Sequence, residues 1–173
     1  MSQTGAALAF WETKSLHDMT LTEWELICDG CGKCCLHKCI DEQETELVVE
    51  SPLKTECSDE AEQVHFTNIA CHLLNTKTCA CSDYQNRTAR VPGCVKLTKD
   101  NLDKIDYLPP SCSYRRLHEG RQLPNWHPLL NRGKKAAMHK VGMSIRGKTV
   151  REDEVNLDFL EDYIALWPLE DLD

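Results

Sequence analysis

The chain has 173 residues and a formal net charge of −8 at pH 7, and 41% of its residues are hydrophobic. This length allows one domain of ordinary size, which we expect over residues 1–173. No apolar run approaches the roughly 18 residues of a membrane span, and the N-terminus lacks the basic segment of a signal peptide. These features argue against a membrane protein and predict a cytoplasmic one.

The first part of the chain predicts a helix that ends at a group of cysteines. Thr20 and Glu23 have the spacing of a capping box, and apolar residues follow for about two turns. The Asp-Gly pair at Asp29 should end this helix. The segment 28–35, Cys-Asp-Gly-Cys-Gly-Lys-Cys-Cys, therefore begins where a helix gives way to a loop.

An acidic insertion is predicted at about 40–62. Residues 41–62 contain nine acidic side chains and one lysine, a composition that favours exposure to solvent. Cys39 and Cys57 flank this segment or lie within it. The alternation in residues 64–69 then predicts a short strand that leads into Cys71.

The second half of the chain predicts further short elements. Ser82, Thr98 and Ser111 are candidate N-caps of helices that reach about residues 88, 105 and 119, the last ended by Gly120. Residues 141–150 predict a β-hairpin, and residues 156–167 predict an amphipathic helix. The fold class we expect is α+β: a small, mainly helical single domain with short strands, organised around a cysteine metal cluster.

Charge is segregated along the C-terminal third. Residues 115–151 contain ten basic side chains and one acid, whereas residues 152–173 contain nine acids and no base. We expect the acidic tail to dock onto the basic stretch within the fold. The alternative is that the basic stretch binds a phosphate-bearing partner.

The number of cysteines predicts a metal centre. The chain has 11 cysteines, and no packing argument requires sulfur at this density. In a reducing cytosol dense cysteines indicate metal binding or catalysis, and an odd number fits poorly with a fully paired disulfide framework. Thiolates are good ligands for zinc, Cu(I) and iron–sulfur clusters.

The spacing of the cysteines leaves two kinds of centre open. Two intervening residues bring both sulfurs to one side of a turn, and Gly30 and Gly32 let that turn curl. The run Cys28, Cys31 and Cys34 resembles the ferredoxin loop around a four-iron cluster, whereas zinc sites more often take two separated pairs. Outside the acidic insertion, nine cysteines suffice for two four-sulfur sites.

Other chemistry is weakly represented in the sequence. His37 and His72 each lie beside or near a cysteine and could bind a metal or hydrogen-bond to a ligand. The chain has no Gly-rich phosphate loop, no Gly-x-Ser-x-Gly turn and no His-Glu-x-x-His helix. These absences disfavour the nucleotide-binding and hydrolytic classes that use such motifs.

Several motifs resemble one bacterial family. They are the run that starts at Cys28, Phe66-Thr-Asn-Ile-Ala-Cys71, Thr78-Cys-Ala-Cys81, Cys94, Cys112-Ser-Tyr-Arg115 and Trp126-His-Pro-Leu-Leu130. Together they look like the YcgN family, within the wider Cys-x2-Cys-x2-Cys-Cys group described as zinc- or iron-chelating. The resemblance covers nearly the whole chain and implies a cytoplasmic bacterial metal-binding protein. The wider group includes a domain of flagellin lysine methylases, which implies redox or methyl-transfer chemistry.

The resemblance narrows the predicted ligand set. The chain departs from the family pattern between about residues 39 and 63, so Cys39 and Cys57 are left out, and Cys112 ranks last because it stands alone in a predicted helix. The cofactor that we expect is an iron–sulfur cluster or zinc. The predicted metal ligands are Cys28, Cys31, Cys34, Cys35, Cys71, Cys79, Cys81 and Cys94.

Two functions lead at this point, and a third, weaker idea is metal storage or trafficking, which needs exposed and exchangeable thiolates. The first is a metal-binding cysteine-cluster protein with a redox or methyl-transfer-related role. The alternative is a structural zinc module that mediates interaction with a protein or RNA. The first is favoured because a purely structural zinc ion needs only four ligands. We expect a protein partner before a nucleic acid, and no membrane contact.

Overall fold

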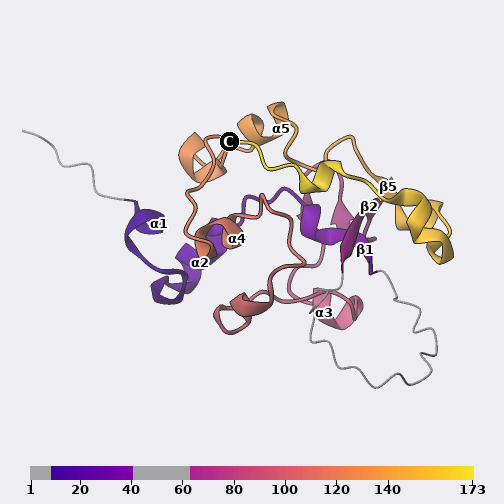
Figure 1. The fold of residues 1–173 in the computed structure, drawn as a ribbon, viewed down its shortest axis with the longest axis horizontal. Coiled ribbons are helices and arrows are strands. Elements are labelled where there is room, and N and C mark those ends of the chain that lie inside the picture. Colours follow the sequence, from indigo (N-terminus) through magenta and orange to yellow (C-terminus); the bar gives the residue numbers. More distant parts are fainter. Residues whose placement is uncertain (1–8, 41–62) are drawn as a thin grey trace, which may run out of the picture.

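Short helices joined by long loops make up most of the protein, whose computed structural model describes residues 9–40 and 63–173 (Figure 1). The predicted insertion therefore lies outside the described residues except at its first position. None of the described helices is long and apolar enough to cross a bilayer. The α-helices are α1 (Phe10–Thr13), α2 (Leu21–Ile27), α3 (Arg87–Arg90), α4 (Ser113–His118) and α5 (Ala136–Lys140).

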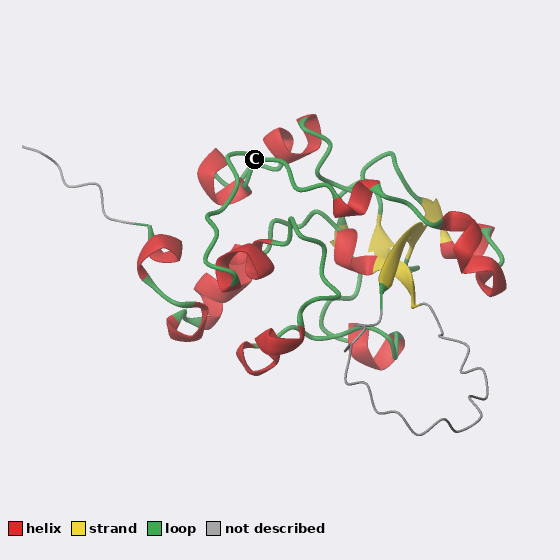
Figure 2. Ribbon diagram, viewed as in Figure 1, coloured by secondary structure: helices red, strands yellow, loops and turns green. Residues whose placement is uncertain are grey.

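Turns of 3₁₀ helix and two small sheets complete the architecture, a mixture of helices and short strands (Figure 2). The 3₁₀ helices are η1 (Leu16–Asp18), η2 (Lys33–Cys35), η3 (Lys99–Lys104), η4 (Pro128–Asn131), η5 (Glu152–Glu154), η6 (Leu157–Tyr163) and η7 (Trp167–Leu169). The strands are β1 (Leu36–Ile40), β2 (Val64–Ala70), β3 (Leu74–Asn75), β4 (Ala80–Cys81) and β5 (Val150–Arg151).

The larger sheet has the strand order β1-β2-β5. β1 runs antiparallel to β2, and β5 runs parallel to it. The strand predicted at 64–69 is confirmed and continues to Ala70, which pairs with Leu36 on one side and Arg151 on the other. The start of β1 and the ends of β2 and β5 therefore meet at one end of the sheet.

The predicted N-terminal helix is confirmed as α2. Its capping box is complete, because the Glu23 amide donates to Thr20 Oγ1 (3.2 Å) and the Thr20 amide donates to Glu23 Oε2 (2.8 Å). The helix ends at Ile27, and Gly30 follows with φ +67°. Local signals at both ends thus decide where the cysteine loop begins.

Two of the three helices predicted after residue 82 are confirmed, as η3 and α4. Thr98 forms a capping box that starts η3, and α4 is followed by Gly120 at φ +75°. The prediction for Ser82 is wrong, because α3 begins only after Asn86. The prediction for Ser111 is also wrong: its hydroxyl accepts a hydrogen bond from the Lys33 ammonium (3.0 Å) instead of capping α4.

Two C-terminal predictions are wrong. Residues 141–149 form turns in place of a hairpin strand, and β5 pairs with β2. Residues 156–167 do not form one amphipathic helix, because η6 is kinked at Phe159 and ends at Tyr163. The amide of Ala165 then donates to the Phe66 carbonyl (2.9 Å), so backbone bonding to β2 outweighs the helical periodicity.

The buried apolar side chains of the described residues form three small clusters, and the cysteine loop lies among them. Ile27 belongs to the first, Cys35 packs against the second and Cys31 belongs to the third. The first cluster joins α2 to α4, where the Tyr114 hydroxyl donates to the Trp24 carbonyl (2.7 Å). The three clusters are Leu16, Met19, Trp24, Ile27, Leu102, Ile105, Leu108 and Tyr114; Leu36, Ala70, Leu74, Cys79 and Ile145; and Cys31, Trp126, Met138 and Met143.

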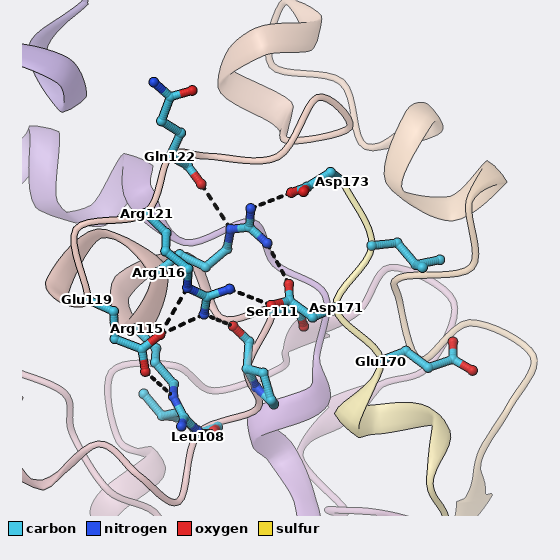
Figure 3. Close-up of polar contacts among 12 residues, drawn as sticks. Leu108, Ser111, Arg115, Arg116, Glu119, Arg121, Gln122, Glu170, Asp171 and Asp173 are labelled. Carbon is cyan, nitrogen blue, oxygen red and sulfur yellow. Dashed lines mark hydrogen bonds and ion pairs between the residues drawn. The ribbon is translucent and has the colours of Figure 1, made fainter.

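The acidic C-terminus docks onto basic side chains, as predicted (Figure 3). Arg116 binds Asp171 (2.5 Å) and Asp173, and Arg121 binds the other oxygen of Asp171. Beside these ion pairs, which we call the C-terminal clamp, the Trp126 indole donates to the Leu172 carbonyl (2.7 Å). The last residues are thus held against α4 and the loop that follows it.

The C-terminal clamp predicts a dependence of stability on pH. Partial burial opposes ionisation of Asp171, but hydrogen bonds from Arg121 and Arg116 outweigh it and hold its pKa below the usual range. A carboxyl with a lowered pKa stabilises the fold above its unfolded-state pKa of about 3.9, and this contribution is lost as the pH falls through the folded-state pKa. Asp171→Asn should therefore cost about 1–3 kcal/mol of unfolding free energy at pH 7 and less at pH 3.

Denaturant unfolding of both proteins at the two pH values measures this difference. Asp158→Asn is the matched control, because Asp158 is exposed on η6. An equal loss for Asp171→Asn at both pH values would contradict an ionic role for the clamp.

Candidate metal centre

The cysteine loop is shaped by two glycines. Gly30 and Gly32 have φ values of +67° and +84°, which side-chain-bearing residues rarely adopt. A Cβ on Gly32 would also lie 2.8 Å from Cγ1 of Ile145. The Ile145 amide donates to the Cys31 carbonyl (3.0 Å). This hydrogen bond joins the turn of the cysteine loop to the segment around Ile145.

Two opposite charges are buried within this loop. Asp29 accepts hydrogen bonds from the Cys31 amide (2.8 Å) and the Ser113 hydroxyl (3.2 Å). Lys33 is fully buried, and its ammonium donates to the Ser111 hydroxyl and to the Glu170 carbonyl (3.3 Å). Burial lowers the pKa of Lys33, while the negative charges of Cys31 and Asp29 oppose that shift.

Sequence reasoning missed both residues, although one signal was present. That signal was position: Asp29 and Lys33 each lie between closely spaced cysteines. Neighbouring ligands hold such a residue close to the metal centre, even though a charged side chain prefers solvent. Asp29 and Lys33 also connect the loop to the start of α4 and to the backbone of Glu170, next to the C-terminal clamp.

A first group of thiols, Cys28, Cys31 and Cys34, lies at the start of the loop. Burial raises the pKa of Cys28, and Asp29, Cys34 and Cys112 raise it further. Burial likewise raises the pKa of Cys31, with added repulsion from Asp29 and Cys34. Backbone amides of Gly30 and Lys33 hydrogen-bond to these two thiols and oppose the shifts.

Cys112 lies with this group although the sequence ranked it last. Burial raises its pKa to about 12, and the charges of Asp29 and Cys34 act on it as well. It immediately precedes α4, whose Ser113 binds Asp29. The link between Cys112 and the loop is made by tertiary structure, which explains why spacing along the chain did not reveal it.

A second group of thiols lies toward the sheet. The pKa of Cys35 is raised by its contact with Cys34, by burial and by the charges of Cys71 and Cys94. Burial raises the pKa of Cys71, and Cys81 and Cys94 also raise it. The backbone joins the same segments, since the Cys71 amide donates to the Cys35 carbonyl (3.1 Å). Cys35, Cys71, Cys81 and Cys94 thus come together from four segments.

Adjacent Cys34 and Cys35 connect the two groups. Their sulfur atoms are 3.9 Å apart, and a hydrogen bond from Cys35 lowers the pKa of Cys34 to about 7 against the effect of burial. The positive charge of Lys38 lowers it further, and the Lys38 ammonium donates to the Cys34 carbonyl (2.9 Å). Cys34 and Cys28 are both partly exposed to solvent. Protein atoms still surround most of each thiol, which is why burial affects both pKa values.

Cys79 has different neighbours. It is buried at φ +57° in the second apolar cluster. Burial raises its pKa, whereas the charges of Lys135 and Arg146 and a hydrogen bond with Ser144 lower it. Its role as a ligand stays a prediction that rests on the sequence.

The two flagged histidines meet at a carboxylate that sequence reasoning did not single out. His37 Nε2 lies 2.6 Å from Glu152 Oε2, and His72 Nδ1 lies 2.5 Å from Glu152 Oε1. Among the described residues, one set of three metal-binding donor atoms lies within 4.8 Å of one another, and it consists of Cys71, His72 and Glu152. In the sequence Glu152 looked like one more acid of the tail.

Comparison with known proteins identifies the chain's relatives. UPF0260 proteins of Shewanella denitrificans and Shewanella baltica are 47% and 49% identical over 96% of this chain and 100% of theirs. A UPF0260 protein of Parvibaculum lavamentivorans is 48% identical over 96% of this chain and 97% of its own. No solved structure matches the chain.

The cysteine loop itself carries the family signature. Residues 27–113 match the CxxCxxCC family, described as "Putative zinc- or iron-chelating domain". The narrower resemblance to the YcgN family stays a prediction. The matched segment contains both thiol groups and the buried Asp29 and Lys33. The chain therefore belongs to the CxxCxxCC family of cysteine-cluster proteins and, within it, is similar over nearly its whole length to the UPF0260 proteins.

Proposed function

We propose that the cysteine groups hold an iron–sulfur centre and that the protein uses it in electron transfer. Zinc is the competing metal, and a methyl-transfer-related role is the second use of such a centre. The candidate ligands are the eight cysteines predicted from the sequence. Cys112 is added to them because it lies beside the cysteine loop. Zinc- or iron-chelation is the property of the family, and electron transfer is our own extension of it.

The spacing of the thiols carries the preference for an iron–sulfur cluster. Zinc binds sulfur at about 2.3 Å, so the sulfurs of a closed tetrahedral site lie roughly 3.8 Å apart. Within residues 9–40 and 63–173, no three thiols lie within 4.8 Å of one another. An iron–sulfur cluster puts its own iron and sulfide atoms between the cysteine sulfurs and therefore needs wider spacing.

The charges around the thiols also support a polynuclear centre. Each thiolate adds a negative charge that burial makes costly. Lys33 is buried within the loop and interacts with Cys31, and the charge of Lys38 acts on Cys34 and Cys35. Positive charge close to several thiolates stabilises their ionised forms and would raise the reduction potential of a bound cluster.

The alternative function, a structural zinc module for a protein or RNA partner, depends on the basic stretch. Arg132, Lys134 and Lys140 are exposed on and near α5. Arg116 and Arg121, by contrast, are engaged in the C-terminal clamp. The stretch therefore has a smaller free basic surface than its sequence indicates, and we place the alternative second.

The first test measures metal and acid-labile sulfide, with a visible spectrum, on protein purified without oxygen. A brown protein with iron and sulfide in equal amounts, bleached by a reductant and restored by an oxidant, supports the proposal. A colourless protein with one or two zinc ions would overturn it and favour the structural module.

Cys31→Ser tests the ligand set. Because metal binding and folding are linked in such domains, this variant should lose metal and several kcal/mol of unfolding free energy. Metal analysis and thermal unfolding measure the two effects. Cys57→Ser, at a cysteine left out of the ligand set, is the matched control and should keep full metal content. Full metal content and an unchanged melting temperature in Cys31→Ser would contradict the assignment.

A further inference from the structure

A mixed group of metal-binding side chains lies at one end of the larger sheet. Ala70 pairs with Leu36 and with Arg151, so the three strands are aligned at this position. Parallel β2 and β5 both leave the sheet here, and their next residues are Cys71 and Glu152. Antiparallel β1 begins here and supplies His37. The sheet register thus brings together side chains that are far apart in the sequence.

The donor atoms are close enough for one ion. Those of Cys71, His72 and Glu152 lie within 4.8 Å of one another. Around a zinc ion with ligand distances of about 2.0–2.2 Å, nitrogen and oxygen ligands lie roughly 3.3 Å apart. The 2.5 Å between His72 Nδ1 and Glu152 Oε1 would have to open by less than about 1 Å. The His72 side chain, 42% exposed, has room for that movement.

The carboxylate is held in place from its other side. His37 Nε2 binds Glu152 Oε2 (2.6 Å), and the His37 carbonyl accepts a hydrogen bond from Thr67 Oγ1 (2.8 Å). Arg151, next to Glu152 in the chain, binds Asp153 (2.8 Å). Both carboxylate oxygens of Glu152 are therefore bound by imidazoles. His37 is a positioning residue, which orients a ligand as outer partners commonly do.

We propose that Cys71, His72 and Glu152 form a second metal site, which binds a zinc ion separately from the cysteine centre. One sulfur, one nitrogen and one oxygen donor suit a borderline-soft divalent ion better than magnesium or calcium, which prefer oxygen. Three protein ligands leave the fourth tetrahedral position to water or another small ligand, as in zinc sites that exchange ligands. The half-exposed setting keeps that position accessible.

This proposal does not rest on the cysteine centre. It assigns Cys71 to the mixed site and leaves the other predicted cysteines, with Cys112, to the centre of the loop. The two sites remain neighbours, because the Cys71 amide donates to the Cys35 carbonyl.

The test titrates the full chain, purified with its cysteine-centre metal in place, with zinc chloride under anaerobic conditions. Calorimetry should show one additional zinc ion bound by the wild type. His72→Ala and Glu152→Gln should each weaken this binding by more than about 100-fold. His118→Ala and Glu161→Gln, at exposed positions on α4 and η6, are the matched controls and should bind as the wild type does. Melting temperatures of the variants establish that each is folded.

Cobalt substitution separates the ligands from the positioning residue. Co²⁺ bound at this site should show a thiolate charge-transfer band that Cys71→Ser removes. His37→Ala should weaken binding about 10- to 100-fold and keep the band, because the sulfur ligand is unchanged. If His37→Ala bound cobalt as tightly as the wild type, its positioning role would be wrong.

The failures of the two proposals are distinguishable. Wild-type zinc affinity in both His72→Ala and Glu152→Gln would overturn the mixed site without touching the cysteine centre. Loss of the cysteine-centre metal from His72→Ala would overturn the claim that the sites are separate. A Cys31→Ser protein that loses only its cysteine-centre metal and still binds the added zinc would support two physically separate sites.

Discussion

The fold depends on the attachment of one loop to everything around it. Residues 28–35 lie among three apolar clusters, none large enough to stabilise a domain of this length alone. Asp29 and Lys33 add buried polar bonds from this loop to both sides of the start of α4 and to the C-terminus. A buried charge that loses its partner costs several kcal/mol, so these contacts specify one arrangement of the loop. Metal bound by the same loop would hold the three clusters together.

Electrostatics explains how an acidic chain tolerates this concentration of thiols. The net charge is −8, yet Lys33, Lys38, Lys135 and Arg146 act on the cysteines directly. Meanwhile the C-terminal clamp uses Arg116 and Arg121 to bind the acids of the tail. The basic stretch therefore divides its charge between the thiols and the tail. This division connects the charge segregation seen in the sequence to the stability of the proposed cysteine centre.

Features set by neighbouring residues could be predicted from the sequence, and features set by distant contacts could not. The capping box at Thr20 and the strand before Cys71 depend on a few adjacent residues, and both are confirmed. The amphipathic pattern of 156–167 failed because β2 offers the backbone of Ala165 a partner. The positions of Cys112 and Glu152 depend on α4 and on sheet register, which no spacing along the chain reveals.

The sheet register has a consequence for both proposed metal sites. Cys35 precedes β1 and Cys71 follows β2, and one backbone hydrogen bond joins them at the aligned end of the sheet. Glu152 reaches the same place because β5 runs parallel to β2. The backbone that carries Cys71 is therefore bonded directly to the backbone that carries Cys35. Because neighbouring backbone carries ligands of both proposed sites, we expect occupancy of one site to alter the affinity of the other, and this coupling must be reciprocal.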